Sequence, residues 1–181
     1  QTQKVLAFYK PVGVTCTERD PHAEKKIMDM IRYPERLTYA GRLDKDSEGL
    51  ILLTNDGDLI NAMMRGANRH EKEYIVKTDR EITPDFLEKM AKGIYLKDLD
   101  ITTRECEIEQ IGKFTFRIVL TQGVNRQIRR MCEACGYRVK ALKRIRIMNI
   151  LLGDLKPGKW REVTGEELEQ LQRDTEMLNR N

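Results

Sequence analysis

The sequence predicts an α+β protein in which a long mixed, mostly antiparallel sheet is flanked by helices. Two observations lead to this class. Short apolar runs with strand patterning, and segments with helical spacing or capping residues, both occur along the whole chain. They do not follow one another in the regular strand–helix order that a doubly wound parallel sheet requires. At 181 residues the chain can bury one good core or two small ones.

The first half of the chain is expected to hold strands and two helices. Residues 5–9 form an apolar run that Pro11 and Gly13 stop, and this predicts a buried strand. Residues 23–32 and 58–65 carry apolar side chains at helical spacing and predict helices. The further strands expected here are short and lie at residues 37–40, 51–53 and 74–76.

Capping and turn residues mark the elements of the second half. Thr83 and Pro84 predict the start of a helix, because threonine can cap and proline at the first helical position loses no needed hydrogen bond. That helix is expected to end at Gly93. Asn125 predicts the cap of another helix, with Gly136 as its stop. Residues 114–120 and 137–147 predict strands, and residues 164–167 a capping box before a last helix.

The composition predicts a soluble cytoplasmic protein. Charged residues make up 34% of the chain. No apolar run approaches the roughly 18–20 residues that span a bilayer, so no membrane contact is expected. Residues 1–9 lack the basic and long apolar regions of a signal peptide.

The four cysteines are expected to be reduced and structural. Without a secretion signal, reduced thiols are the default. Cys132 and Cys135 have the spacing of half a zinc site, but the sequence offers no second close pair of cysteine or histidine residues. We therefore predict no metal site.

Positive charge is concentrated between residues 126 and 146, although the net charge is only +4. Eight Lys or Arg residues face one acid, Glu133, in this segment. They alternate with apolar residues that should point into the core, which would gather the charges on one surface. Composition favours a phosphate-facing patch there over a merely solvated face.

The most distinctive segment is the polar loop at residues 41–50 (GRLDKDSEGL). It places Arg42 and Asp44 just before an apolar run, and a loop anchored by a buried strand can hold a reactive side chain beside solvent. Read alone, Asp44 is more often a turn former than a catalytic group. The loop also begins like a calcium-binding loop, but such a loop needs a glutamate at its twelfth position, where Asn55 stands. Calcium binding is therefore disfavoured.

Four segments, in order, resemble the motifs of the pseudouridine synthases, in the branch of RsuA, RluB, RluE and RluF that modifies ribosomal RNA. They are residues 10–13 (KPVG), 41–50, 72–74 (KEY) and 123–131 (GVNRQIRRM). The resemblance covers nearly the whole chain, and the residues of these segments are most similar to those of the RluF-like members. It implies a pseudouridine synthase catalytic fold, with a long mixed sheet, helices on its outer faces and a central RNA-binding cleft.

The resemblance implies an enzyme that isomerises uridine in RNA to pseudouridine. It implies a monomeric catalytic domain over residues 1–181, without the S4-type RNA-binding domain usual in this branch. The expected substrate is 23S ribosomal RNA, with a tRNA uridine as additional or main target. The reaction breaks the N1–C1′ bond and forms a C5–C1′ bond without net redox change, so no cofactor is expected, but the target base must leave its helix. A non-catalytic RNA-binding module, which would not need Asp44, is the alternative.

The resemblance also implies roles for single residues. Asp44 is expected to be the essential carboxylate, Arg129 the cation paired with it, and Tyr74 a ring that stacks on the target base. The expected substrate contacts are Arg42 and Ile128 at the flipped nucleotide, Lys10 at the loop or at a phosphate, and Arg126, Arg130, Lys143 and Arg144 along the RNA.

Overall fold

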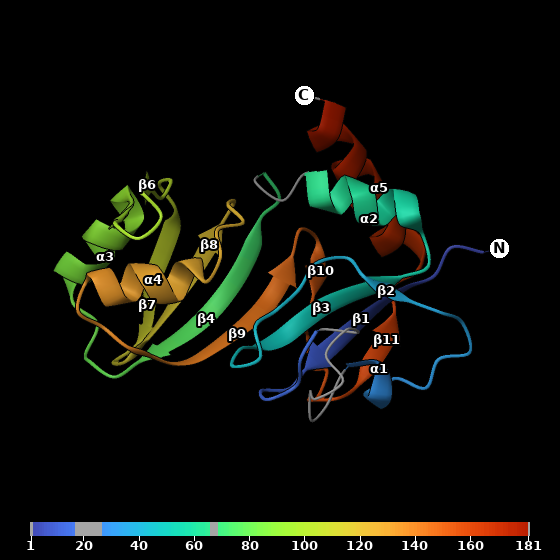
Figure 1. The fold of residues 1–181 in the computed structure, drawn as a ribbon, viewed down its shortest axis with the longest axis horizontal. Helices are drawn as coiled ribbons and strands as arrows, with labels where there is room; N and C mark the ends of the chain where they lie inside the picture. The colour runs from blue at the N-terminus through green and yellow to red at the C-terminus, as the bar shows by residue number, and fades with distance from the viewer. Residues whose placement is uncertain (1, 17–26, 66–68, 181) are drawn as a thin grey trace.

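One long sheet runs through the molecule in the computed structural model, which describes residues 2–16, 27–65 and 69–180 (Figure 1). Its central order is β11-β1-β3-β9-β4-β8-β7, with β2 beside β3 and β10 beside β9. Among the strands of the described residues, only β3 and β9 pair in parallel, so the predicted α+β class with a mixed, mostly antiparallel sheet is confirmed. The strands are β1 (Val5–Lys10), β2 (Thr38–Tyr39), β3 (Glu48–Thr54), β4 (Lys72–Thr78), β7 (Glu107–Gly112), β8 (Thr115–Leu120), β9 (Val139–Ile147), β10 (Ile150–Leu151) and β11 (Trp160–Glu162).

Helices cover the two ends of this sheet separately, and they divide the molecule into two halves joined by β9. In the half we call the β3 half, α2 and α5 pack together beside β1 and β3 (Figure 1). In the β4 half, α3 and α4 lie against β4, β7 and β8 (Figure 1). The helices are α1 (Ile27–Met30), α2 (Gly57–Arg65), α3 (Pro84–Lys92), α4 (Gln127–Ala134) and α5 (Gly165–Arg180), and a small hairpin is formed by β5 (Tyr95–Leu96) and β6 (Ile101–Thr102).

The β3 half is built on two strands that are buried on both faces. Alternate residues of β3 enter different clusters: Leu50 and Leu52 pack towards α2 and α5, whereas Ile51 and Leu53 pack towards α1. All six residues of β1 are buried as well. Strands buried on both faces appear in a sequence as continuous apolar runs, which is the pattern that predicted β1.

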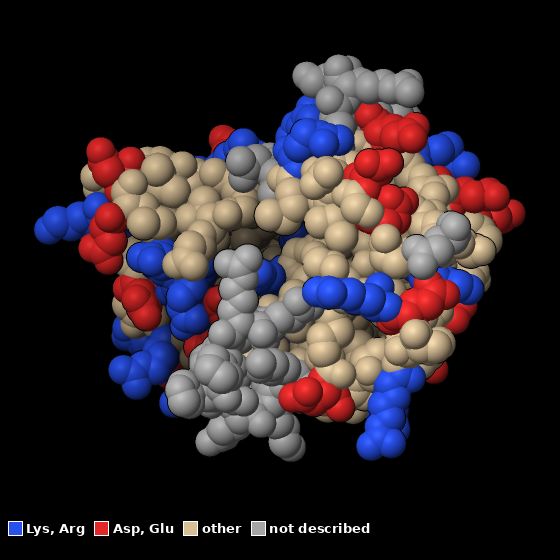
Figure 2. All heavy atoms as spheres, turned by 45° about the vertical axis from the view of Figure 1, so that its right-hand side comes forward, with Lys and Arg blue, Asp and Glu red and all other residues tan. Residues whose placement is uncertain are grey.

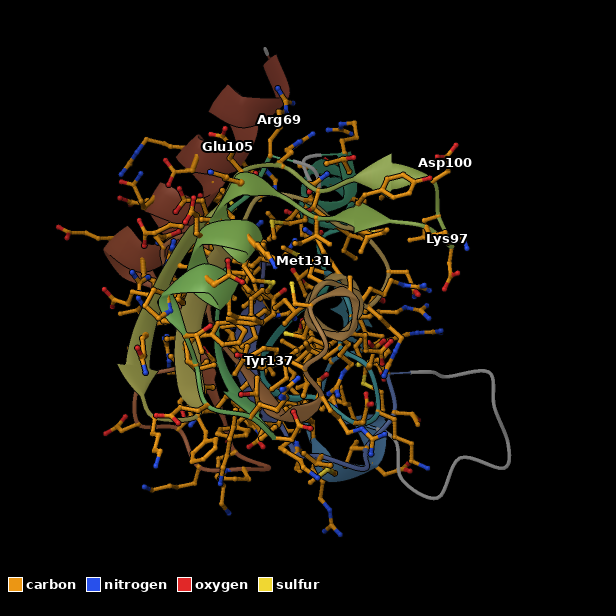
Figure 3. All side chains as sticks on the ribbon, turned by 90° about the vertical axis from the view of Figure 1, so that its left-hand side faces the viewer. Arg69, Lys97, Asp100, Glu105, Met131 and Tyr137 are labelled. Atoms are coloured by element: carbon orange, nitrogen blue, oxygen red, sulfur yellow. The ribbon has the colours of Figure 1, made fainter. Side chains whose placement is uncertain are left out.

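The β4 half is covered on one face only. Val76 and Phe116 are fully buried under α3 and α4, together with Met131 of α4. Figure 3 shows Met131 in the middle of the molecule, and Lys97 and Asp100 at the outer tip of the β5–β6 hairpin. The strand β7 at the edge of the sheet is mostly exposed, which explains why its polar sequence carried no strand signal.

Local signals placed one helix start correctly and another wrongly. Thr83 caps α3 as predicted, because its side chain accepts a hydrogen bond of 3.1 Å from the main-chain N–H of Phe86. Asn125 does not cap α4. The N-cap is Arg126, whose backbone is left-handed with φ of 50°, and no side chain caps the helix. The helix predicted at residues 23–32 lies partly outside the described residues, and α1 is its described part.

Candidate active site

A pocket of about 500 Å³ lies where the two halves of the molecule meet. Its walls come from the loop after β2, from α2, from the start of β4, from the second half of β9, and from the start of α4 with the segment before it. Figure 2 shows the surface hollowed between the halves, with Lys or Arg side chains at the hollow. The pocket brings together seven of the residues predicted for the site: Arg42, Asp44, Tyr74, Arg126, Ile128, Arg129 and Arg144.

The loop that carries Asp44 is fixed by main-chain contacts. The N–H of Ser47 donates to the carbonyl of Asp44 at 3.0 Å, and the N–H of Gly13 donates to the carbonyl of Lys45 at 2.8 Å. Gly49 ends the loop with φ of 114°, and a side-chain carbon there would lie 2.2 Å from the main-chain oxygen of Arg144. Only glycine lets β3 approach β9 this closely.

Lys10 is buried against this loop and donates to its main chain. Its side chain is fully buried, and Nζ donates to the carbonyls of Pro11 and Val14 at 2.8 Å each and to that of Lys45 at 3.4 Å. Burial lowers the pKa of Lys10. Three carbonyls use all three N–H groups of the ammonium. The loop-supporting role predicted for Lys10 therefore fits, and the phosphate contact does not.

Arg126, and not Arg129, is the arginine that contacts Asp44. Arg126 Nη1 lies 3.1 Å from Asp44 Oδ2 and 3.0 Å from Asp46 Oδ1, and Nη2 lies 2.8 Å from Asp46 Oδ2. The prediction paired Asp44 with Arg129 and assigned Arg126 to the RNA. Arg126 is the N-cap of α4, and its left-handed backbone directs the side chain differently from helical spacing.

Arg129 instead holds the main chain of the loop. Its Nη2 donates to the carbonyl of Asp46 at 3.0 Å and to Ser47 Oγ at 3.1 Å. Its Nη1 lies 3.5 Å from Asp46 Oδ2, and its side chain is 14% exposed. The Nε of Arg129 is buried and has no hydrogen-bond partner among the described residues. Both arginines of this helix start thus face the loop, but only one contacts Asp44.

The charges in the loop are balanced by these arginines. The hydrogen bond from Arg126 lowers the pKa of Asp46 below its usual range, with a further contribution from Arg129. The same interactions raise the pKa of Arg126. Asp46 is therefore an ionised carboxylate that fixes Arg126. The Asp44 side chain remains 42% exposed at the pocket.

Strand β4 contributes an aromatic ring and a cation to the same pocket. Tyr74 and Lys72 are two residues apart and so project from the same face of the strand. Ile128, which is 4% exposed, forms part of the apolar wall. Lys72 was not predicted as a site residue, although its alternation with Tyr74 was a usable signal. Burial and the nearby charge of Arg144 lower the pKa of Lys72 to about 8.

The basic run of β9 does not form one outward patch, contrary to the prediction. Arg144 is 4% exposed, and its Nε donates to the carbonyl of Leu50 at 2.9 Å, so it joins the strands. Lys143 and Arg146 pair in register with Ile75 and Glu73, on the sheet face opposite Tyr74. Arg146 bonds to Glu73 there at 2.8 Å. Arg144 and Arg146 are two residues apart, and simple alternation would put them on one face. The register shift between Glu73 and Tyr74 places them on opposite faces instead.

Arg130 and Arg42 were also predicted to contact RNA, and the structure places them in different surroundings. Arg130 donates to the carbonyl of Asn125 at 2.9 Å and to its Oδ1 at 3.2 Å, so it ties down the segment before α4. Arg42 is exposed at the pocket, where an RNA contact remains a prediction.

The described residues contain no group of three His, Cys, Asp or Glu side chains that could hold a metal ion. Cys132 is fully buried in the core of the β4 half, and burial raises its pKa to about 12, which makes it an inert packing residue.

Within the same described ranges, no helix is both long and apolar enough to cross a membrane.

Comparisons with known proteins identify relatives. The family model described as RNA pseudouridylate synthase matches residues 4–134. The chain is 47% identical over 164 residues to the dual-specificity RNA pseudouridine synthase RluF of Escherichia coli, across 91% of this chain and 56% of the relative. It is 35% identical over 169 residues to the ribosomal large subunit pseudouridine synthase B of Vibrio cholerae, across 88% of this chain and 51% of the relative. The chain thus spans about half the length of these curated relatives.

A solved structure supports the same relationship. The crystal structure of a pseudouridylate synthase superposes with a TM-score of 0.84 at 29% sequence identity, across 94% of this chain and 74% of that one.

Proposed function

The chain belongs to the RNA pseudouridylate synthase family, and from this premise we propose that it isomerises uridine to pseudouridine in 23S ribosomal RNA, with a tRNA uridine as a second target. The support for these substrates is the similarity to a dual-specificity enzyme and to a ribosomal large-subunit enzyme. We treat residues 1–181 as one catalytic domain that acts as a monomer in the cytoplasm.

Asp44 is the group we assign to the reacting sugar. It is the carboxylate that lines the pocket and contacts Arg126 at 3.1 Å, and this one observation carries the proposal. An adjacent guanidinium fixes the direction of a carboxylate. A carboxylate directed in this way can act at the sugar either as a nucleophile or as a base.

The rest of the pocket suits a single extruded base. Uracil must separate from the sugar, turn and rejoin through C5, while its C5 proton is lost and N1 gains one. A base inside a duplex cannot do this, so the target nucleotide is flipped into a pocket. We assign Tyr74 as the ring on which uracil stacks and Ile128 as the apolar wall. Arg42 and Lys72 are the cations placed to meet its phosphate or carbonyl oxygens.

The experiment that tests this function is release of tritium from C5-labelled uridine in a 23S ribosomal RNA fragment and in a tRNA anticodon stem-loop. We expect turnover by the chain, and its loss in Asp44→Asn, which keeps the shape of the side chain and removes its charge. Asp98→Asn is the matched control, because the Asp98 side chain is 88% exposed.

Three results would count against parts of the proposal. Asp44→Asn activity within tenfold of the parent would remove Asp44 from the chemistry. Turnover on the tRNA stem-loop alone would reverse the order of substrates. RNA binding without release from either RNA would favour the non-catalytic RNA-binding module.

A further inference from the structure

The loop carries a second carboxylate, Asp46, that the reaction itself does not call for. Asp46 does not line the pocket, whereas Asp44 does. It nevertheless makes the shorter contact with the shared arginine: Nη2 of Arg126 lies 2.8 Å from Asp46 Oδ2, and Nη1 lies 3.0 Å from Asp46 Oδ1. Arg126 therefore forms a bidentate pair with Asp46, and a single N–H interaction with Asp44 at 3.1 Å.

The sharing of the Arg126 guanidinium between Asp46 and Asp44 fixes the direction of its contact with Asp44. A guanidinium is a planar fork whose two outer nitrogens fit one carboxylate in parallel. Asp46 takes one N–H from each outer nitrogen, and the second N–H of Nη1 is the one that reaches Asp44. Released from Asp46, the fork could pair with both oxygens of Asp44 or turn away from it, and either change would alter the group that we assign to the sugar.

The carboxylate of Asp46 is not needed to hold the loop itself. The main chain is held by Lys10 and Gly13 at the carbonyl of Lys45, and by Arg129 at the carbonyl of Asp46. These contacts use backbone oxygens and survive the loss of the Asp46 side chain. The side chain thus has one main partner, Arg126, and a weaker contact of 3.5 Å with Arg129.

We propose that Asp46 is a positioning residue, which holds the Arg126 guanidinium so that a single N–H is directed at Asp44. The proposal rests on the function assigned above. A misplacement of about 1 Å near a reacting centre can lower a rate about 100-fold. We therefore expect Asp46→Asn to lower kcat about 10- to 100-fold, with the KM for RNA within about threefold of the parent. Asp46→Glu, which restores the charge, should recover part of the loss.

A double-variant cycle separates positioning from any independent role. If Asp46 acts through Arg126, Asp46→Asn should change kcat by less than about twofold in an Arg126→Gln background. The same 10- to 100-fold loss in both backgrounds would overturn the proposal. Single-turnover tritium release measures these slow variants, and a thermal unfolding curve for each confirms that it is folded.

A measurement on the free protein keeps this test separate from the assigned function. In nitrogen-15 spectra of arginine side chains, a guanidinium held by a bidentate pair rotates slowly. We expect slow rotation of Arg126 in the parent and in Asp44→Asn, and fast rotation in Asp46→Asn. Slow rotation retained in Asp46→Asn would overturn the proposed positioning, even if the enzyme acted on no RNA tested. If instead the spectra behave as expected but no RNA is modified, the assigned function fails and the proposed holding of Arg126 stands.

Discussion

The two halves of the molecule are built differently, and the carboxylates of the site and the arginines that contact them come from opposite halves. The β3 half contains two strands buried on both faces, and its loop carries Asp44 and Asp46. The β4 half is covered on one face and open on the other, and its helix start carries Arg126 and Arg129. Carboxylates anchored to the more deeply buried half meet arginines that reach across from the less buried half.

Because the two kinds of charge come from different halves, the junction between the halves sets the geometry of the site. The two halves are joined in the sheet by a short parallel contact, in which Glu48 pairs with Lys143 and Gly49 with Arg144. The buried Arg144 then donates from β9 to the carbonyl of Leu50 in β3. The distance between the carboxylate loop and the arginines depends on this junction.

The largest effect should come from filling the junction. Gly49→Ala would place a carbon against the main chain of Arg144 and force φ of 114° on a residue with a side chain. We expect a loss of about 3 kcal/mol or more in the free energy of unfolding, together with loss of turnover. Urea unfolding measures the first quantity. The control is Gly57→Ala, because nothing lies within 4 Å of a carbon added there. Equal stability of the two variants would show that β3 and β9 can move apart to accommodate the added carbon.

The next effect concerns the support of the carboxylate loop. Lys10→Met removes a buried ammonium and leaves its three acceptor carbonyls without that donor. We expect a loss of about 2–3 kcal/mol in unfolding free energy. Lys45→Met, at an exposed position of the same loop, should change stability little. If Lys10→Met weakened only RNA affinity and left the urea midpoint unchanged, Lys10 would be a phosphate ligand after all.

The sequence predicts the backbone elements of the molecule better than it predicts the side-chain contacts of the site. The apolar runs of β1 and β3 and the capped start of α3 were readable, because local pattern decides them. The motif around Asp44 located the pocket, since several matching segments converge there. The edge strand β7 was missed because an exposed strand needs no apolar run.

The partners of the cations could not be predicted, for a physical reason. Lys10 and Arg144 are buried and donate to backbone carbonyls. Every residue carries a carbonyl, so the sequence does not indicate which ones will accept these hydrogen bonds. Arg126 reaches Asp44 through a left-handed residue, which spacing along an ideal helix does not anticipate. A basic residue near an RNA motif was therefore assigned to RNA in several places where the fold itself uses it.

A smaller effect should appear in the acid stability of the molecule. His70 is buried, and this burial lowers its pKa to about 4 from the model-peptide value of 6.5. Between these values the unfolded chain binds a proton that the folded chain does not, so stability falls as pH drops through this window. We expect His70 to contribute about 3 kcal/mol of this loss. Unfolding free energies of the parent and His70→Gln, compared across the window, should converge at low pH, whereas parallel curves would exclude His70 as the cause.

The smallest effect concerns the cation beside Tyr74. The pKa of Lys72 is about 8, so its positive charge is lost as pH rises through that value. If this ammonium contacts RNA, affinity should fall about three- to tenfold between about pH 7 and pH 9. Lys72→Met should lack this step, and Lys77→Met, at an exposed position of the same strand, should keep it. An identical pH profile in all three proteins would place Lys72 outside the RNA contact.

The central claim is that a carboxylate from one half acts with Arg126 from the other. The most direct test is kcat at saturating RNA for Arg126→Met, measured by tritium release beside Arg130→Met as a matched control on the same helix. We expect Arg126→Met to lower kcat about 100-fold with little change in KM, because Asp44, the partner of Arg126, is the group that we propose for the reacting sugar. Arg130→Met should keep kcat within a few-fold of the parent. An Arg126→Met enzyme with parental kcat, changed only in RNA affinity and its salt dependence, would contradict the account and make Arg126 a phosphate ligand.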